Sequence, residues 1–306
     1  MKIYYLLRMA SWLAGWVPSR FAYRVCSLVG GIVFWVRPSI RHDIMDNMSH
    51  ILPKSTSRQR RNIARRVIRN NFKNYYDLIR IPHMTKEYLF RTVKVVGLEN
   101  LDAAFALGKG AIIIGGHIGN FNIVPQAAKI RGYPIVAVDE DIKPRQLYNY
   151  LNRLRSHFGL RFIGTNSSEI RTIYKLLRNN NALILAIDRD VAGSREPVLL
   201  FDELADLPPG PVALALRLDA ALVPVHAVRL RDNTSIVHIY PAIPLERTGD
   251  KEKDLKINLR KAAQALEEMI LKAPDQWVVL QRVWDRPEDR GSGVGGRGRE
   301  SKWTLV

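Results

Sequence analysis

One short stretch of the chain carries the side chain best suited to chemistry. An apolar run, residues 110–114, leads into paired glycines and then to His117. An imidazole that titrates at about pH 6.5 can take a proton from an alcohol and return it to a leaving group, so His117 is a candidate general base. Gly115, Gly116 and Gly119 would clear space for a substrate and expose backbone N–H groups to an oxyanion. The alternative is a histidine that only caps or packs.

A second polar group follows the apolar run 182–187. Asp188, Arg189 and Asp190 stand there, where a predicted strand passes into a loop. The planar guanidinium of Arg189 suits the oxygens of a phosphate or of a thioester-bearing group. An ion pair with Asp188 or Asp190 is the alternative for the same side chain. We expect Asp188 and Arg189 to contribute to a substrate site.

The elements that must position these residues begin near residue 91, where short apolar runs alternate with helical stretches. This alternation predicts an α/β fold, with a mixed, mostly parallel sheet flanked by helices. The predicted strands are 93–96, 111–114, 134–138, 160–163, 182–187, 198–201, 222–228 and 235–240. The predicted helices are 121–130, 143–158, 166–180, one that opens at 208–211, and 254–272. Because parallel sheets bind ligands at the carboxyl ends of their strands, His117 is expected at that edge.

The first 90 residues predict helices with unusual surfaces. Large aromatic residues alternate there with arginines, a mixture that suits the headgroup region of a membrane. The residues concerned are Tyr4, Tyr5, Trp12, Trp16, Phe21, Tyr23, Phe34 and Trp35, with Arg8, Arg20, Arg24 and Arg37. A later helix, 57–81, is almost purely basic, which favours a surface of anionic lipid. The alternative is a helical hairpin whose aromatic residues form a core.

Charge and composition narrow the class of partner. The chain has 47 Lys and Arg against 29 Asp and Glu, a net charge of +18, which attracts a polyanion. Nucleic acid and an anionic membrane are the two candidates. Recognition modules for nucleic acid are absent from the sequence, and the aromatic residues sit in apolar helices, so an anionic membrane surface is the expected partner. Three segments are expected: a helical membrane-associated region, 1–90, an α/β domain, 91–289, and a flexible basic tail, 290–306.

Other classes are excluded in turn. A chain of 306 residues with 47% hydrophobic residues builds a real core, which excludes a disordered or fibrous protein. Arg8 interrupts the first apolar run and no small-residue cleavage site follows, which argues against a cleaved signal. The longest uncharged apolar stretch, 25–36, is shorter than the about 20 residues that a membrane-spanning helix needs. The single Cys26 and the spacing of the histidines predict no metal site.

The motif around His117 is similar to that of a known enzyme family. His117 precedes Ile-Gly-Asn-Phe and follows a Gly-Lys-Gly turn and an aliphatic strand. This pattern resembles the first conserved block of the bacterial lipid A biosynthesis and phosphatidylinositol mannoside acyltransferases, a branch of the lysophospholipid acyltransferase superfamily. The resemblance extends over almost the whole chain and includes residues 95–99, 139–144 and 276–280. It implies a fold like that of glycerol-3-phosphate acyltransferase.

The resemblance also implies a mechanism. In that family the histidine, paired with an acidic residue five positions later, deprotonates an acceptor hydroxyl that attacks an acyl thioester directly. Asn122 stands at the acidic position here. An amide oxygen can hold the ring in one tautomer but cannot stabilise the imidazolium by charge. Glu140, Asp188 or Asp190 is then the candidate source of that charge.

Together the residues and the resemblance give a full set of expectations. The catalytic residues are expected to be His117, Asn122 and Glu140, and the substrate-binding residues Gly116, Gly119, Asn120, Arg155, Asp188 and Arg189. The expected function is transfer of a fatty acyl chain from acyl-CoA or acyl carrier protein to a hydroxyl of a glycolipid or phospholipid, at the cytoplasmic face of the inner membrane and without a cofactor. The alternative, suggested by Asn122, is a weakened or inactive lipid-binding relative.

Overall fold

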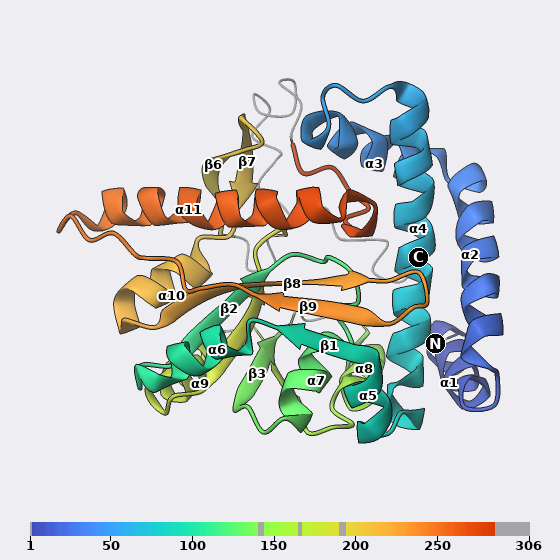
Figure 1. Cartoon of the computed structure of the whole chain (residues 1–306), viewed down its shortest axis with the longest axis horizontal. Helices are drawn as coiled ribbons and strands as arrows, with labels where there is room; N and C mark the ends of the chain where they lie inside the picture. Colours follow the sequence, from blue (N-terminus) through green and yellow to red (C-terminus); the bar gives the residue numbers. More distant parts are fainter. Residues whose placement is uncertain (1, 140–143, 165–166, 190–193, 285–306) are drawn as a thin grey trace.

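A seven-stranded sheet forms the centre of the computed structural model, which describes residues 2–139, 144–164, 167–189 and 194–284 (Figure 1). The strand order is β1-β9-β8-β2-β5-β3-β4. The strands are β1 (Val93–Val96), β2 (Ala111–Gly115), β3 (Ile135–Val138), β4 (Arg161–Ile163), β5 (Ala182–Ala186), β8 (Ala221–Arg229) and β9 (Ser235–Ile239). The predicted α/β fold with a mixed, mostly parallel sheet is confirmed.

Five neighbouring strands, β8, β2, β5, β3 and β4, run parallel. Strand β9 runs antiparallel to β8 and parallel to β1. The reversal follows from the short turn after β8, in which the Leu230 N–H donates to Thr234, because a link this short cannot make the crossover that parallel strands need. The carboxyl ends of the five parallel strands therefore meet at one edge of the sheet.

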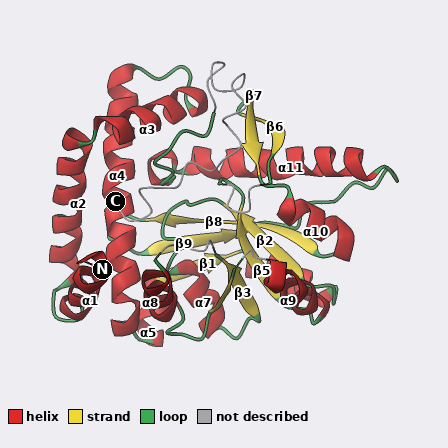
Figure 2. Ribbon diagram, turned by 180° about the vertical axis from the view of Figure 1, so that it is seen from behind, coloured by secondary structure: helices red, strands yellow, loops and turns green. Residues whose placement is uncertain are grey.

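Helices cover both faces of the sheet (Figures 1 and 2). Apolar residues of α9 (Ser167–Arg178), α10 (Gly210–Leu218) and α11 (Lys251–Lys272) join one buried cluster with the sheet. Those of α5 (Lys86–Thr92), α6 (Leu98–Ala106), α7 (Val124–Ile130) and α8 (Arg145–Arg155) join a second cluster on the other face. Ile112 and Ile114 point to the first face and Ile113 to the second, as alternation along a strand requires.

Four helices precede the sheet: α1 (Lys2–Ala14), α2 (Ser19–Val36), α3 (Pro38–Ile51) and α4 (Ser57–Arg80). Thr56 and Gln59 begin α4 with a reciprocal capping box. Figure 1 shows α4 standing across the edge where the parallel strands end, with α2 on its outer side. Phe34 and Val67 belong to the same buried cluster as Ile114, so these helices share a core with the sheet. Within the described residues, no helix has both the length and the apolar character that crossing a bilayer requires.

Two features were not predicted. The short helices α5 and α6 flank β1, and β6 (Glu196–Leu200) pairs with β7 (Glu203–Leu207) as an antiparallel hairpin, where only one strand was expected. Phe201 and Asp202 form its turn with φ of 52° and 63°. Two successive positive φ angles match the twist of a two-residue hairpin, but the sequence lacks the glycine that usually signals one. The predicted basic tail, 290–306, lies outside the described residues.

The close packing of α2 on α4 makes a first testable prediction. A Cβ at Gly30 would lie 2.8 Å from the Arg69 Cα, whereas one at Gly31 would come no nearer than 3.4 Å to the flexible end of Arg69. We expect Gly30→Ala to lower the free energy of unfolding by about 1–3 kcal/mol, since backbone must move. The control Gly31→Ala should be neutral or stabilise by about 0.5–1 kcal/mol, as a helical Gly→Ala change does. Urea denaturation of both variants checks this, and equal stability would contradict it.

Candidate active site

His117 faces an acidic side chain from the neighbouring strand. Strands β2 and β5 pair in parallel with Gly115 opposite Ala186. His117 and Asp188 each lie two residues beyond that pair, so the register places them together. The His117 Nδ1 lies 2.8 Å from the Asp188 Oδ1. This contact provides the charge that the sequence could assign only to one of three candidates.

The second oxygen of Asp188 is also bound. It accepts from the His117 backbone N–H at 2.6 Å and from the Trp277 indole N–H at 2.9 Å. Burial alone would raise the pKa of Asp188, but the His117 ring and these donors lower it below its usual value. The carboxylate is therefore ionised at neutral pH. It holds Nδ1 of the ring as the protonated nitrogen, which leaves Nε2 to accept a proton.

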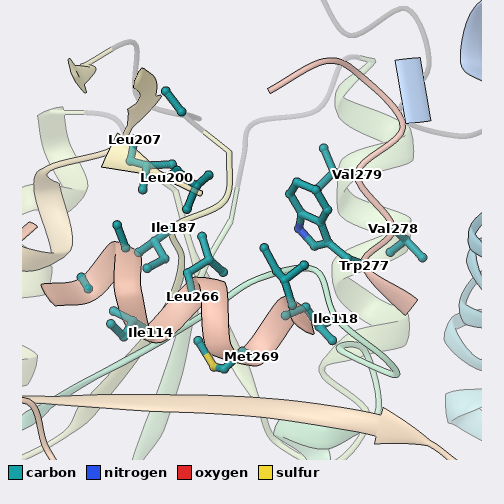
Figure 3. Close-up of a cluster of buried hydrophobic side chains, with 14 of the residues drawn as sticks. Ile114, Ile118, Ile187, Leu200, Leu207, Leu266, Met269, Trp277, Val278 and Val279 are labelled. Carbon is teal, nitrogen blue, oxygen red and sulfur yellow. The ribbon is translucent and has the colours of Figure 1, made fainter. Parts of the chain in front are cut away.

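The segment after α11 holds the loop that carries His117. Val278 N–H donates to the His117 carbonyl, and Gly119 N–H donates to the Gln276 carbonyl. Figure 3 shows the Trp277 side chain within the buried cluster, close to Ile118. Trp277 is fully buried, and sequence reasoning did not identify it as a site residue. The only signal was its place in the stretch 276–280, where it carried part of the family resemblance.

Packing explains the glycines near His117. A Cβ at Gly116 would lie 2.9 Å from the Asp188 Oδ2, and one at Gly119 would lie 2.2 Å from the Ala227 carbonyl oxygen. Gly119 also has φ of +62°, a conformation that favours glycine. The backbone N–H groups of His117 and Gly119 are bound to Asp188 and Gln276. The Gly119 N–H, which the sequence predicted to be open to an oxyanion, is thus bound within the protein.

A cavity of about 220 Å³ opens beside His117. It runs between one face of the sheet and the helices α6 and α7, and its lining is almost entirely apolar. The main lining residues are Leu98, Leu101, Ile113, Phe121, Val124, Pro125, Ala128, Ile135, Ala137, Leu160, Phe162, Ile184, Val225, Val237 and Ile239. The polar lining residues are His117, Asn122, Arg131, Asp139, Arg155 and His226, and Arg155 Nη1 lies 2.6 Å from Asp139 Oδ2. The His117 side chain is 25% exposed and reaches this space.

Comparisons with known sequences agree with a histidine that contacts a buried carboxylate beside an apolar cavity. The sequence model of a family described as bacterial lipid A biosynthesis acyltransferase matches residues 1–286. The chain belongs to this family. The resemblance inferred from the sequence is confirmed.

Individual relatives of this family member support the assignment. A phosphatidylinositol mannoside acyltransferase from Mycobacterium tuberculosis (strain CDC 1551 / Oshkosh) is 29% identical over 213 residues, which cover 68% of this chain and 66% of the relative. One from Mycolicibacterium smegmatis is 24% identical over 254 residues, which cover 81% and 82%. The chain thus spans slightly less than two thirds of the first relative and most of the second.

The structure separates the predicted site residues of this family member into groups. His117, Gly116, Asn122 and Arg155 line the cavity. Asp188 was predicted both as a substrate-binding residue and as a possible partner of His117, and it binds the His117 ring. Arg189 follows it and is half-buried. Glu140 lies outside the described residues, as does Asp190, so their expected roles stay predictions.

Two predicted residues have unexpected neighbours. Asn122 is buried, and its amide points to the Asn74 carbonyl at 3.5 Å, while the His117 Nδ1 is bound to Asp188. Asn120 is also buried, and its amide donates to Asp77 at 2.9 Å, away from the cavity. Among the described residues, no three His, Cys, Asp or Glu side chains gather in a way that could hold a metal ion.

Separate substitutions at Asp188 and at Asn122 test this geometry. We expect Asp188→Asn to lower kcat for acyl transfer by about 10⁴-fold, because an amide cannot stabilise the imidazolium and its NH₂ would face other donors. Asn122→Asp should not raise kcat, since Asp188 already binds Nδ1. Steady-state kinetics, with circular dichroism as a check on folding, measures both. A large gain in Asn122→Asp would show that the active ring turns away from Asp188.

Proposed function

We propose that this chain is an O-acyltransferase that moves a fatty acyl group from a thioester to a hydroxyl of a glycolipid or phospholipid. The observation that supports this proposal most directly is the His117–Asp188 pair beside an apolar cavity. A general base must lie where the acceptor hydroxyl meets the acyl carbonyl. This edge of the sheet offers a base and, beside it, a cavity for the acyl chain. The names of the mycobacterial relatives favour a phosphatidylinositol mannoside or a similar glycolipid as acceptor.

The proposed reaction proceeds without a covalent acyl-enzyme. Nε2 of His117 takes the proton of the acceptor hydroxyl while that oxygen forms a bond to the thioester carbon. The carbon–sulfur bond then breaks, and the imidazolium returns the proton to the departing thiolate. Asp188, ionised and buried, stabilises the imidazolium between these two steps. The same carboxylate favours a fully active enzyme over a weakened relative. Asp188 supplies the negative charge beside the His117 ring, so Asn122 does not need to supply it.

The cavity would hold the acyl chain. Burying each CH₂ group contributes about 0.8 kcal/mol, so an apolar channel of this kind selects a long chain over a short one. Arg155 and Asp139 lie at the polar part of the cavity. The Arg155 guanidinium suits the polar end of the donor, where acyl-CoA carries phosphates and an acyl carrier protein carries acidic residues. Both donors remain within the proposal.

Helices α1 and α2 would dock the enzyme on the cytoplasmic face of the membrane, where acyl thioesters are made. Their outer surface is rich in exposed apolar residues: Tyr5, Leu6, Met9, Trp12, Leu13, Trp16, Phe21, Val25, Leu28, Val29, Ile32, Trp35 and Val36. Neither helix contains an acidic residue. Arg8, Arg20 and Arg24 are exposed beside the apolar residues. Apolar surface fringed by cations suits the interface of an anionic bilayer.

Lipid analysis of cells tests the catalytic proposal. Mass spectrometry of lipids from cells that lack the gene should show a species that has lost one acyl chain. The wild-type gene should restore the fully acylated lipid, and His117→Ala should not, since the proposed proton acceptor is gone. A blot of the membrane fraction would confirm equal amounts of both proteins. Full restoration by His117→Ala would refute the assigned base.

Vesicle binding tests the membrane surface. Trp12 and Trp16 are 63% and 75% exposed. Replacing both by Ser should weaken binding to phosphatidylglycerol vesicles at least about tenfold, because each ring loses a favourable transfer out of water. Leu107→Ser, at a residue 61% exposed near the end of α6, is the matched control and should bind as the wild type does. Co-sedimentation measures both, and equal loss in the two proteins would reject this surface.

A further inference from the structure

A second buried carboxylate lies near the first but takes no part in the proposed chemistry. Asp77 of α4 is 1% exposed. Its Oδ1 accepts from the Tyr23 hydroxyl at 2.6 Å. Its Oδ2 accepts from Arg229 Nη2 at 2.6 Å and from the Asn120 amide at 2.9 Å. Four segments of the chain therefore meet at one charge: α2, α4, the end of β8 and the loop after His117.

The same network reaches the reactive loop at a second point. Asn74, one turn before Asp77 on α4, donates to the Gly119 carbonyl at 2.7 Å. Arg229 Nη2 also donates to Asn74 Oδ1 at 2.7 Å, which fixes the direction of that amide. Gly119 and Asn120, two and three residues after His117, are thus both tied to α4. None of Tyr23, Asp77, Asn120 and Arg229 lines the cavity, so the network does not touch a substrate there.

The loop needs such ties. Gly115, Gly116 and Gly119 give its backbone more conformational freedom than other residues would. A displacement of about 1 Å in a reactive group can cost about 10²-fold in rate. Tyr23 adds a connection of another kind, because it comes from α2, whose outer face is apolar and exposed. Burial and Asp77 raise the pKa of the Tyr23 hydroxyl, so it stays a donor at all physiological pH values.

We propose that Asp77 is a positioning residue that ties helix α2 to the loop carrying His117. With α2 seated on α4, Tyr23 and Asn120 share the Asp77 carboxylate, and the loop holds His117 against Asp188. Loss of the α2 contact loosens the loop and turns the ring away from its carboxylate. This inference rests on the proposed acyl transfer for its consequence in rate, but the effect on the position of His117 is independent of that reaction.

Two tyrosines at the α2–α4 contact provide a matched pair of variants. Tyr23 and Tyr76 pack edge to face at 5.2 Å and are each 7% exposed. The Tyr23 hydroxyl binds Asp77, whereas the Tyr76 hydroxyl has no hydrogen-bond partner among the described residues. Tyr23→Phe and Tyr76→Phe each remove one buried oxygen. Only Tyr23→Phe removes an interaction with Asp77.

The first measurement is the ¹⁵N spectrum of the histidine rings in the full-length protein, with the His117 signals assigned by their loss in His117→Ala. We expect Tyr23→Phe to shift the His117 ring signals and Tyr76→Phe to leave them in place. The second is CoA release from palmitoyl-CoA with vesicles of total membrane lipid, well below the unfolding temperature. There Tyr23→Phe should lower the maximal rate about tenfold, with unchanged half-saturating palmitoyl-CoA, and Tyr76→Phe should match the wild type.

The outcomes separate the two proposals. Identical His117 signals in Tyr23→Phe, Tyr76→Phe and the wild type would overturn the positioning role, whatever the rates. A rise in half-saturating palmitoyl-CoA with an unchanged maximal rate would also overturn it, because that result indicates a binding role. Acyl transfer that survives His117→Ala would overturn the proposed function instead, while the ring signals still decide the role of Asp77.

Discussion

The buried carboxylate of Asp188 is the group on which the rest of the site depends. An ionised carboxylate removed from water is costly unless donors surround it. Here two donors come from His117 and one from Trp277. To supply them, the end of β2, the end of β5 and the segment after α11 must converge within hydrogen-bond distance. The close approach of Asp188 to Gly116 and the buried indole of Trp277 both follow from that requirement.

The parallel order of the sheet makes this convergence possible. Neighbouring parallel strands end at the same edge, so residues far apart in sequence, His117 and Asp188, meet through register alone. Alternation along the same strands directs one set of side chains into the apolar cavity and the other set into the core beneath α11. The candidate base therefore lies at the edge, while the apolar cavity lies under one face. The two are joined at His117.

Two buried carboxylates at this edge have different partners and different consequences. Asp188 binds an imidazole, whose charge changes when it accepts a proton. Asp77 binds the guanidinium of Arg229, whose charge stays fixed. The first pair suits catalysis and the second suits a permanent structural tie. Because α4 carries Asp77 and also supports α2, the exposed apolar surface and the reactive loop are parts of one packed unit.

The sequence alone determined the fold class and singled out His117 as the candidate base. Hydrophobic periodicity is a local property, so strands such as β1 and helices such as α4 could be predicted to within a few residues. His117 could be identified as a candidate because it stands among glycines at the end of a predicted strand. The partner of that histidine could not be chosen among Glu140, Asp188 and Asp190, and the sequence did not predict the contacts of Asn122 with Asn74 and of Asn120 with Asp77. Those choices depend on strand register and on contacts across more than 40 residues, which local patterns do not encode. Only the folded chain brings Asp188, Trp277 and Asp77 to the same edge of the sheet.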